Sequence, residues 1–394
     1  MFAELRAARN PLIRMVAAAA LVLLAACAPT AMTGTVSGGQ RIDPSKPVPV
    51  ALLVPKSAPQ GGAILAQSAE NAARLAMADL SGVQIDLRVY DTAGQPARAA
   101  QVARQAVEEG ARVLLGPVYS QTSNAAGTAV AGQRVNVLSL SNTTAIAGGN
   151  VFVLGSTFSN TAQRLVGYAD RRGKQRIFVI HGNDPAETAG RDAIVAAIRA
   201  RGVGLAGVGG FELSQQGVTA TVPRLAQQAR DAGADAVFFT SSTDGALPFL
   251  ADLLPENGLG GDVAQYIGLT RLDIPASALS LRGLQGAWFA LPDQNTAAGF
   301  RARYRAAYGA DPHPIVAAPA YDGIAAIGAL AARGSADALT ARGLTQGQGF
   351  AGASGVFRLL PDGTNERALA VAQIQNNQVT VIDPAPRRFG GAGF

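Results

Sequence analysis

The chain has 394 residues, of which 48% are hydrophobic and 15% are charged, and its formal net charge at pH 7 is +6. Such a composition is typical of a globular protein with a large core. The basic residues stand singly rather than in runs with aromatic neighbours, which argues against nucleic acid as a partner. Because Cys27 is the only cysteine, an internal disulfide is excluded.

The first 26 residues have the pattern of a secretory signal peptide. Arg6, Arg9 and Arg14 form a basic head, and residues 15–26 form an unbroken apolar run. A membrane-spanning helix needs about 20 apolar residues, so this run is too short to cross a bilayer. We therefore expect residues 1–26 to be removed from the mature protein.

The apolar run ends in Leu-Ala-Ala-Cys at 24–27, which resembles the lipobox of bacterial lipoproteins. The resemblance implies that the sulfur of Cys27 is alkylated with diacylglycerol, that the peptide is cut before Cys27, and that the new amine is acylated. Several acyl chains together anchor a protein stably. The alternative is an ordinary secretory signal in which Cys27 is incidental.

The residues after the cysteine bear on the destination of the protein. Proteobacterial lipoproteins retained at the inner membrane tend to have aspartate directly after the cysteine, whereas this chain has Ala28. The resemblance therefore implies a lipid anchor in the inner leaflet of the outer membrane of a Gram-negative bacterium, facing the periplasm. Residues 27–47, rich in Thr, Gly, Ser and Pro, are predicted to be the lipid anchor and a flexible tether.

The body that follows has about 345 residues, more than one core usually serves, which favours two lobes. Its short apolar runs alternate with alanine-rich stretches, the pattern of a parallel sheet covered by helices. The first series predicts strands at 48–54, 83–90, 112–115 and 135–140 and helices at 67–80 and 97–109. The second series predicts strands at 176–181, 203–211, 234–240 and 264–269 and helices at 163–172, 190–201, 222–232 and 244–254. We expect an α/β protein with two doubly wound, Rossmann-like lobes.

The last part of the chain is expected to pass between the lobes as a multi-strand hinge. It predicts strands at 285–291 and 354–360, helices at 297–308 and 320–332, and a hairpin of 368–373 with 378–382. We assign residues 48–156 and 287–352 to lobe one and residues 157–286 and 353–383 to lobe two. The Gly-rich tail, 384–394, is predicted to be disordered.

Several stretches, taken in this order, resemble the branched-chain amino-acid-binding, or type 1 periplasmic-binding, superfamily. They are VYDT at 89–92, GARVLLGPVYS at 110–120, VLSLSNT at 137–143, AYDG at 320–323 and GASGVF at 352–357. The resemblance implies the two-lobed type 1 periplasmic-binding fold. Within it, the lipobox, VYDT, LSLSN at 138–142 and NVFVLG at 150–155 are most similar to penicillin-binding-protein activators. Those are outer-membrane lipoproteins that contact a peptidoglycan synthase.

Two polar segments, 116–120 and 140–143, follow predicted strands of lobe one, where open parallel sheets bind ligands. In the amino-acid-binding relatives these segments hold the carboxylate and amine of the ligand through backbone amides and short hydroxyls. The resemblance implies ligand contacts from Ser120, Ser141, Asn142 and Thr143. The alternative is that Ser120, Ser141 and Asn142 only cap helices.

The opposite lobe departs from the amino-acid-binding pattern. Relatives usually have an aromatic residue before the glycine that packs on the ligand, but here Thr188 and Ala189 precede Gly190. No acidic residue directly follows the strand at 264–269 to hold an amine. One half of an amino-acid clamp is therefore retained and the other half is lost.

Three other residues in the matching stretches could have either a structural or a functional role. Tyr321 and Asp322 follow Pro319 and could contact the cleft, but we favour packing with a carboxylate in the first helical turn. Asp91 could bind a ligand or hydrogen-bond the turn that follows it.

The sequence gives little support to an enzyme. His181 and His313, the only histidines, are far apart and in no metal-ligand spacing, and no Gly-x-Ser-x-Gly or phosphate-loop motif is present. We predict a non-enzymatic protein with no catalytic residue, metal or cofactor. The first hypothesis is a regulator (activator) of a peptidoglycan synthase, a penicillin-binding protein. The alternative is a receptor that delivers an amino acid or similar small polar ligand to the permease of an ABC uptake transporter.

Overall fold

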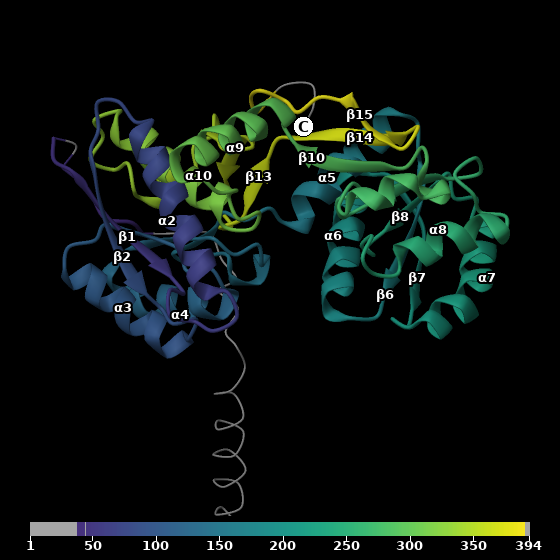
Figure 1. The fold of residues 1–394 in the computed structure, drawn as a ribbon, viewed down its shortest axis with the longest axis horizontal. Coiled ribbons are helices and arrows are strands. Elements are labelled where there is room, and N and C mark those ends of the chain that lie inside the picture. The colour runs from purple at the N-terminus through teal and green to yellow at the C-terminus, as the bar shows by residue number, and fades with distance from the viewer. Residues whose placement is uncertain (1–37, 44, 391–394) are drawn as a thin grey trace, which may run out of the picture.

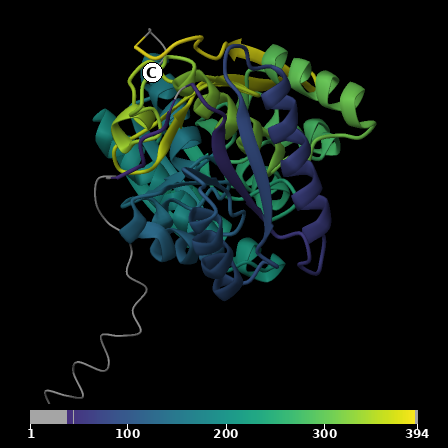
Figure 2. The same cartoon turned by 90° about the vertical axis from the view of Figure 1, so that its left-hand side faces the viewer.

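The computed structural model describes residues 38–43 and 45–390. Two α/β lobes lie side by side and are connected along one end (Figure 1). In Figure 2 the first lobe faces the viewer and the second lies behind it. Among the described residues, no helix combines the length and the apolar character that crossing a membrane requires.

The first lobe contains a five-stranded parallel sheet in the order β2-β1-β3-β4-β5. Its strands are β1 (Val48–Val54), β2 (Ile85–Asp91), β3 (Val113–Leu115), β4 (Asn136–Ser139) and β5 (Val151–Val153). Its helices are α2 (Gly62–Ala78), α3 (Pro96–Glu108), α4 (Ser120–Val130), α9 (Gln294–Tyr308), α10 (Ala317–Ala331) and the short α11 (Ala341–Leu344).

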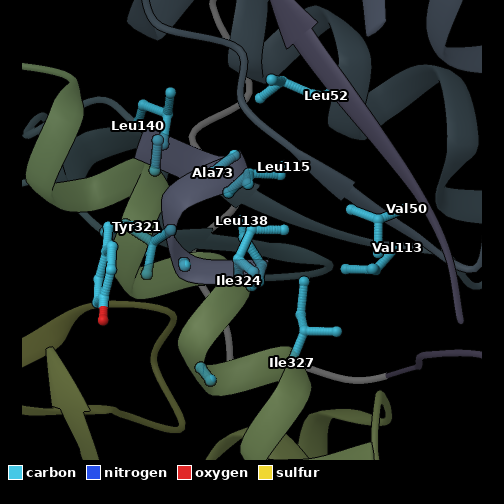
Figure 3. Close-up of a cluster of buried hydrophobic side chains, with 14 of the residues drawn as sticks. Val50, Leu52, Ala73, Val113, Leu115, Leu138, Leu140, Tyr321, Ile324 and Ile327 are labelled. Atoms are coloured by element: carbon cyan, nitrogen blue, oxygen red, sulfur yellow. The ribbon is translucent and has the colours of Figure 1, made fainter. Parts of the chain in front are cut away.

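Side-chain alternation along β1 places a core on each face of this sheet. Val50 and Leu52 belong to the cluster formed with α2 and α10, whereas Ala51 and Leu53 belong to the cluster formed with α3 and α4. Figure 3 shows Ile324 of α10 beside Leu138 of β4 in the first cluster. The strand is therefore apolar on both sides, as a central parallel strand must be.

The second lobe contains a seven-stranded sheet in the order β15-β14-β10-β9-β8-β6-β7, in which β14 and β15 are antiparallel to their neighbours. Its strands are β6 (Arg176–Gly182), β7 (Gly204–Phe211), β8 (Ala236–Phe239), β9 (Gln265–Gly268), β10 (Trp288–Pro292), β14 (Leu369–Gln375) and β15 (Gln378–Asp383). Helices α5 (Phe158–Arg171) and α6 (Pro185–Arg201) cover one face, and α7 (Gln215–Asp231) and α8 (Leu247–Glu256) cover the other.

A small antiparallel sheet of β11 (Phe350–Gly352), β12 (Gly355–Leu359) and β13 (Asn365–Arg367) packs on the first lobe. Short 3₁₀ helices occupy Ala131–Gln133, Thr144–Ile146, Ala276–Ser280 and Arg282–Leu284. The chain passes between the lobes three times: between β5 and α5, between β10 and α9, and between β13 and β14. We call these segments the three crossovers.

The last crossovers lie at different residues from those predicted. Strand β10, predicted in lobe one, pairs with β9 and β14 and so belongs to the second sheet. Residues 353–367, predicted in lobe two, return to the first lobe, where Phe357 and Leu359 are buried beside Phe350. The reason is long-range pairing, which the local pattern does not specify.

Both ends of the body are better packed than predicted. In the expected tether, Ile42 is buried, its N–H donates to Ala336 O (2.9 Å), and Gly39 N–H donates to Arg134 O (2.8 Å). In the expected disordered tail, Ala385 is buried in the second lobe and the guanidinium of Arg358 stacks over Phe389. The predictions are therefore wrong for 38–43 and 384–390, while the signal peptide, Cys27 and residues 391–394 lie outside the described residues.

Asp91 binds the turn after β2, as one of its two readings predicted. Its Oδ1 accepts hydrogen bonds from Ala93 N–H (2.9 Å) and Ser57 N–H (3.1 Å), and its Oδ2 accepts one from Ser57 Oγ (2.6 Å). Burial acts to raise the pKa of Asp91, but the hydrogen bonds from Ser57 and Ala93 outweigh it and hold the pKa below its ordinary value. The ionised carboxylate therefore stabilises the folded turn.

Replacing Asp91 with alanine is expected to lower the free energy of unfolding by about 1–2 kcal/mol at pH 7, because three donors lose a charged acceptor. A lowered folded-state pKa gives stability above the unfolded value, near 4, that is lost as the pH falls through the folded value. Urea unfolding at pH 7 and pH 3 should show the difference shrinking. Asp252→Ala, at an exposed site, is the control; equal losses for Asp91→Ala at both pH values would contradict the role of the charge.

Candidate functional site

The loop after β4 carries three of the four predicted ligand residues, Ser141, Asn142 and Thr143, next to a pair of buried hydroxyls. Ser123 Oγ and Ser139 Oγ lie 2.7 Å apart in the interior. Ser139 Oγ also accepts from Ser141 N–H (3.1 Å), and Ser141 Oγ accepts from Thr143 N–H (3.1 Å). The hydroxyl of Ser141 therefore stabilises its own loop, but it caps no helix, since the 3₁₀ helix that follows has Thr143 as its N-cap and no side-chain cap.

The fourth residue, Ser120, begins α4, where Tyr119 is the N-cap and no side chain caps the helix. Ser120 thus lies one position inside the helix and does not act as its cap. Asn142 is exposed. The ligand-binding role of Ser120, Ser141, Asn142 and Thr143 stays a prediction.

A cavity of about 590 Å³ lies between the lobes and beside the hinge. It contacts all three crossovers, through Gly155 and Ser156, through Pro292 and Gln294, and through Arg367. We call it the interlobe cavity. Of the predicted ligand residues, Asn142 lines it, whereas Ser120, Ser141 and Thr143 do not.

The first lobe contributes most of the wall, and the second lobe closes one side. Helix α9 supplies Phe300, Arg301 and Arg305, the loop before α10 supplies residues 311–315, and the first turn of α10 supplies Ala317 to Pro319. Arg271, in the loop after β9, reaches the cavity from the second lobe. A ligand here would therefore touch both lobes and the segments that join them.

The cavity is rich in arginine, and most of the arginines have carboxylate partners. Arg305 Nη2 lies 2.7 Å from Asp311 Oδ2, and its Nε also donates to that carboxylate. Arg271 Nε donates to Asp273 Oδ1 at 2.6 Å. The hydrogen bond from Arg305, together with the charges of Arg305 and Arg301, holds the pKa of Asp311 below its ordinary value.

Arg367, in the wall of the cavity, forms a buried ion pair at the hinge. Its Nη1 donates to Asp322 Oδ2 at 2.7 Å, and the two side chains are 6% and 0% exposed. Its Nη2 donates to Leu154 O, at the start of the first crossover, and Asp322 Oδ1 accepts from Ala353 N–H (2.7 Å). Burial raises the pKa of Asp322, whereas Arg367 and the Ala353 amide oppose the rise.

These contacts correct the preferred reading of Asp322. Helix α10 begins at Ala317, so Asp322 lies beyond its first turn and faces the interior as half of an ion pair. Tyr321 does pack within the first lobe, where its hydroxyl donates to Asp79 Oδ2 at the end of α2 (2.6 Å). Asn365 adds a further tie at the hinge, where its Nδ2 donates to Val153 O (2.7 Å) and Gly155 O (2.9 Å).

The second lobe has an acidic residue at its sheet edge that the sequence reading did not identify. Glu187 Oε2 accepts hydrogen bonds from Gly182 N–H (2.5 Å), Thr240 Oγ1 (2.7 Å) and Ser241 Oγ (2.8 Å). It comes from the first turn of α6 rather than from the loop after β9. Three donors already use this oxygen, and Glu187 does not line the interlobe cavity.

The described residues offer few other side chains that could bind a metal ion or act in catalysis. In residues 38–43 and 45–390, no three or more His, Cys, Asp and Glu side chains are grouped so that they could hold a metal ion. His181 is buried with its Nδ1 2.8 Å from Gly182 O, and His313 lines the interlobe cavity. The two histidines therefore lie in different lobes, His181 in β6 and His313 before α10.

Residues 47–378 match the family model described as periplasmic binding protein, and the chain belongs to this family. The predicted fold class, two doubly wound lobes of the type 1 periplasmic-binding fold, is confirmed. A search of curated proteins finds no match.

Solved structures share the fold at low sequence identity. A branched-chain amino acid ABC transporter periplasmic ligand-binding protein from Burkholderia xenovorans is 19% identical, with a TM-score of 0.64 over 86% of this chain and 94% of that one. An ABC transporter substrate-binding protein from Sphaerobacter thermophilus is 18% identical, with a TM-score of 0.65 over 89% and 100%. One from Desulfitobacterium hafniense, in complex with Leu, is 16% identical, with a TM-score of 0.58 over 86% and 100%.

Proposed function

We propose that this protein is a solute-binding receptor that delivers a small polar ligand to an ABC uptake transporter. The observation that carries the proposal is the interlobe cavity, which contacts Arg271 of the second lobe, the helices of the first lobe and all three crossovers. A ligand in that position stabilises one angle between the lobes over others, which is how hinged receptors signal occupancy. The solved structures of similar fold include ABC transporter substrate-binding proteins, one of them with bound Leu.

The proposal includes the compartment and the mode of attachment. The protein acts in the periplasm without catalysis, and Cys27 carries the lipid that holds it at a membrane. Outer-membrane placement, inferred from Ala28, is part of the hypothesis. Palmitate labelling of the wild-type chain and of Cys27→Ser, followed by membrane fractionation, tests both statements.

The second candidate is the regulator of a peptidoglycan synthase, which the first hypothesis favoured. The comparisons with known proteins lend support to the receptor instead. One observation still favours the regulator: Ser120, Ser141 and Thr143, the residues predicted to hold an amino acid, do not line the interlobe cavity. Binding of the purified protein to a bifunctional synthase would support this candidate.

Ligand binding is expected to raise the melting temperature of the protein and to close the lobes. A ligand at 100 times its dissociation constant adds about 2.7 kcal/mol to the free energy of unfolding. We would screen amino acids, carboxylic acids and sugars by thermal unfolding, and measure the radius of gyration of each hit by small-angle X-ray scattering. A stabilising ligand should reduce the radius.

Two matched variants on α9 locate the binding site. Ala297 lines the interlobe cavity, so Ala297→Trp should abolish the shift in melting temperature by filling the space. Ala302 is exposed on the same helix and outside the cavity, so Ala302→Trp should preserve it. No stabilisation by any compound, or equal stabilisation of the two variants, would contradict the proposal.

A further inference from the structure

We propose that the interlobe cavity selects a small organic carboxylate with an apolar body and without an ammonium group, rather than an amino acid. This inference rests on the receptor function proposed above and names the class of its ligand. It follows from the charges that line the cavity, from the orientation of α10, and from the apolar side chains of the same wall.

Within the described chain, three of the four arginines that line the cavity have a carboxylate partner, only Arg301 has none, and no lining carboxylate is free for an ammonium group. Its charged lining consists of four arginines and one acidic residue, Asp311. Arg305 engages Asp311 through two nitrogens. A zwitterionic amino acid would therefore place its ammonium group among arginines without a counter-ion, and desolvating an unpaired charge is costly.

Arg301 is the arginine best placed to pair with an anionic ligand. It is exposed on α9 and lines the cavity. Within the described chain its side chain forms no hydrogen bond or ion pair, although its charge lowers the pKa of Asp311. A carboxylate in the cavity could accept a charge-assisted hydrogen bond from Arg301 without displacing an existing partner.

The first turn of α10 adds a second source of positive potential. Ala317, Ala318 and Pro319 line the cavity at the N-terminus of this 15-residue helix. The N-cap residue, Val316, supplies no side-chain cap, and no acidic residue lies in the first turn. The Ala317 amide donates to His313 O (3.2 Å) and Pro319 has no N–H, but no carboxylate of the first turn offsets the positive end of the helix dipole, which favours an anion beside it.

Arg367 adds an unsatisfied hydrogen-bond donor to the same wall, although Asp322 balances its charge. Its side chain is 6% exposed, lines the cavity, and carries an Nε that has no hydrogen-bond partner among the described residues. An unpaired buried donor is unfavourable unless a ligand, water or rearrangement satisfies it. The apolar side chains of Leu140, Phe300 and Ile315 complete the wall and fit a hydrocarbon body.

The test compares acids with the amino acids of the same carbon skeleton. We would titrate the purified protein by calorimetry with 4-methylpentanoate and leucine, with 3-phenylpropanoate and phenylalanine, and with uncharged amides of both acids. At least one acid should bind, and its amino-acid and amide partners should bind at least about 10-fold more weakly, given the strength of charge-assisted pairing.

Variants at two arginines distinguish a direct contact between Arg301 and the ligand from an effect of the overall charge of the protein. Arg301→Gln should weaken binding of the acid by about 10-fold or more, since it removes the unpaired cation. Arg224→Gln is the control, because Arg224 is exposed on α7 and bonds only Gln228 of the same helix. It should change the affinity by less than about 2-fold.

The outcomes distinguish this inference from the function on which it rests. Amino acids or amides that bind as tightly as the acids, or an Arg301→Gln variant with unchanged affinity, would overturn the carboxylate assignment and leave the receptor function standing. Failure of every compound to bind, here and in the broader screen, would overturn the receptor function and the carboxylate assignment together.

Discussion

Replacing Asp322 with alanine is expected to lower the free energy of unfolding by about 3–5 kcal/mol, because it leaves a buried arginine without its counter-ion. The two side chains are nearly inaccessible and only 2.7 Å apart. Asp322 also accepts the Ala353 amide, so the variant leaves a second buried donor unpaired. Urea unfolding followed by circular dichroism measures the loss directly.

A double variant tests whether the stability depends on the two charges of the pair or on the volume that the two side chains fill. Removing both charges, with Asp322→Leu and Arg367→Met together, should recover much of the stability, since a hydrophobic pair avoids the desolvation of two ions. Glu70→Ala is the control, because its pair with Arg74 lies on the surface of α2 and contributes at most about 0.5 kcal/mol. A loss for Asp322→Ala no larger than that of the control would contradict the role of the buried pair.

The same pair links stability to the hinge. Arg367 ends β13 and donates to Leu154 O, so it ties the third crossover to the first. Asp322 holds the guanidinium in place from α10, a helix whose first turn lines the interlobe cavity. The loss of Asp322 is therefore expected to affect both the folding of the first lobe and the geometry of the cavity.

The central strands could be predicted from sequence because they are buried on both faces. Strand β1 has the predicted bounds, and β6 extends the predicted strand by one residue. In contrast, β5 has only three residues, too few for a periodic signal. Helix α4 was missed because its Ser, Thr and Gly residues have low helical propensity; it is stabilised by packing, through Ala126 and Val130, in the core it shares with α3.

Sheet membership in the last quarter of the chain depends on pairing between distant residues. The apolar run of β10 predicts a strand, but it does not predict that Trp288 pairs with Ile267 in the second sheet and with Gln373 of β14. The return of Phe357 to the first core is likewise a long-range contact. The presence of these strands was therefore easier to predict than their assignment to lobes.

The candidate site was predicted only in part. The loop after β4 was expected to contact the ligand, and Asn142 of this loop does line the cavity. The arginines of α9 were missed, although a sequence signal existed: Arg301 and Arg305 are four residues apart and so share one face of a helix. What the sequence could not show is that this face meets the crossovers, because they come from three distant parts of the chain.

Replacing Gly116 with alanine is expected to lower the free energy of unfolding by about 3–5 kcal/mol, the sum of backbone strain and a steric clash. Gly116 follows β3 with a φ of +90°, a conformation that residues with a side chain rarely adopt. A Cβ at this position would lie 2.2 Å from Leu53 O, in the central strand β1. Since β1 pairs with strands on both sides, it cannot move away without disturbing the sheet.

A second glycine variant measures the cost of the backbone strain without the steric clash. Gly110 has a φ of +101°, but a Cβ there meets nothing within 4 Å. Gly110→Ala is therefore expected to cost only the strain of the left-handed conformation, about 1–2 kcal/mol. Urea unfolding of both variants should show the larger loss for Gly116→Ala, and the difference is the cost of pushing against β1. Equal losses would mean that the sheet accommodates a methyl group at Gly116, and that the loop leading to Ser120 does not require glycine for close approach to Leu53.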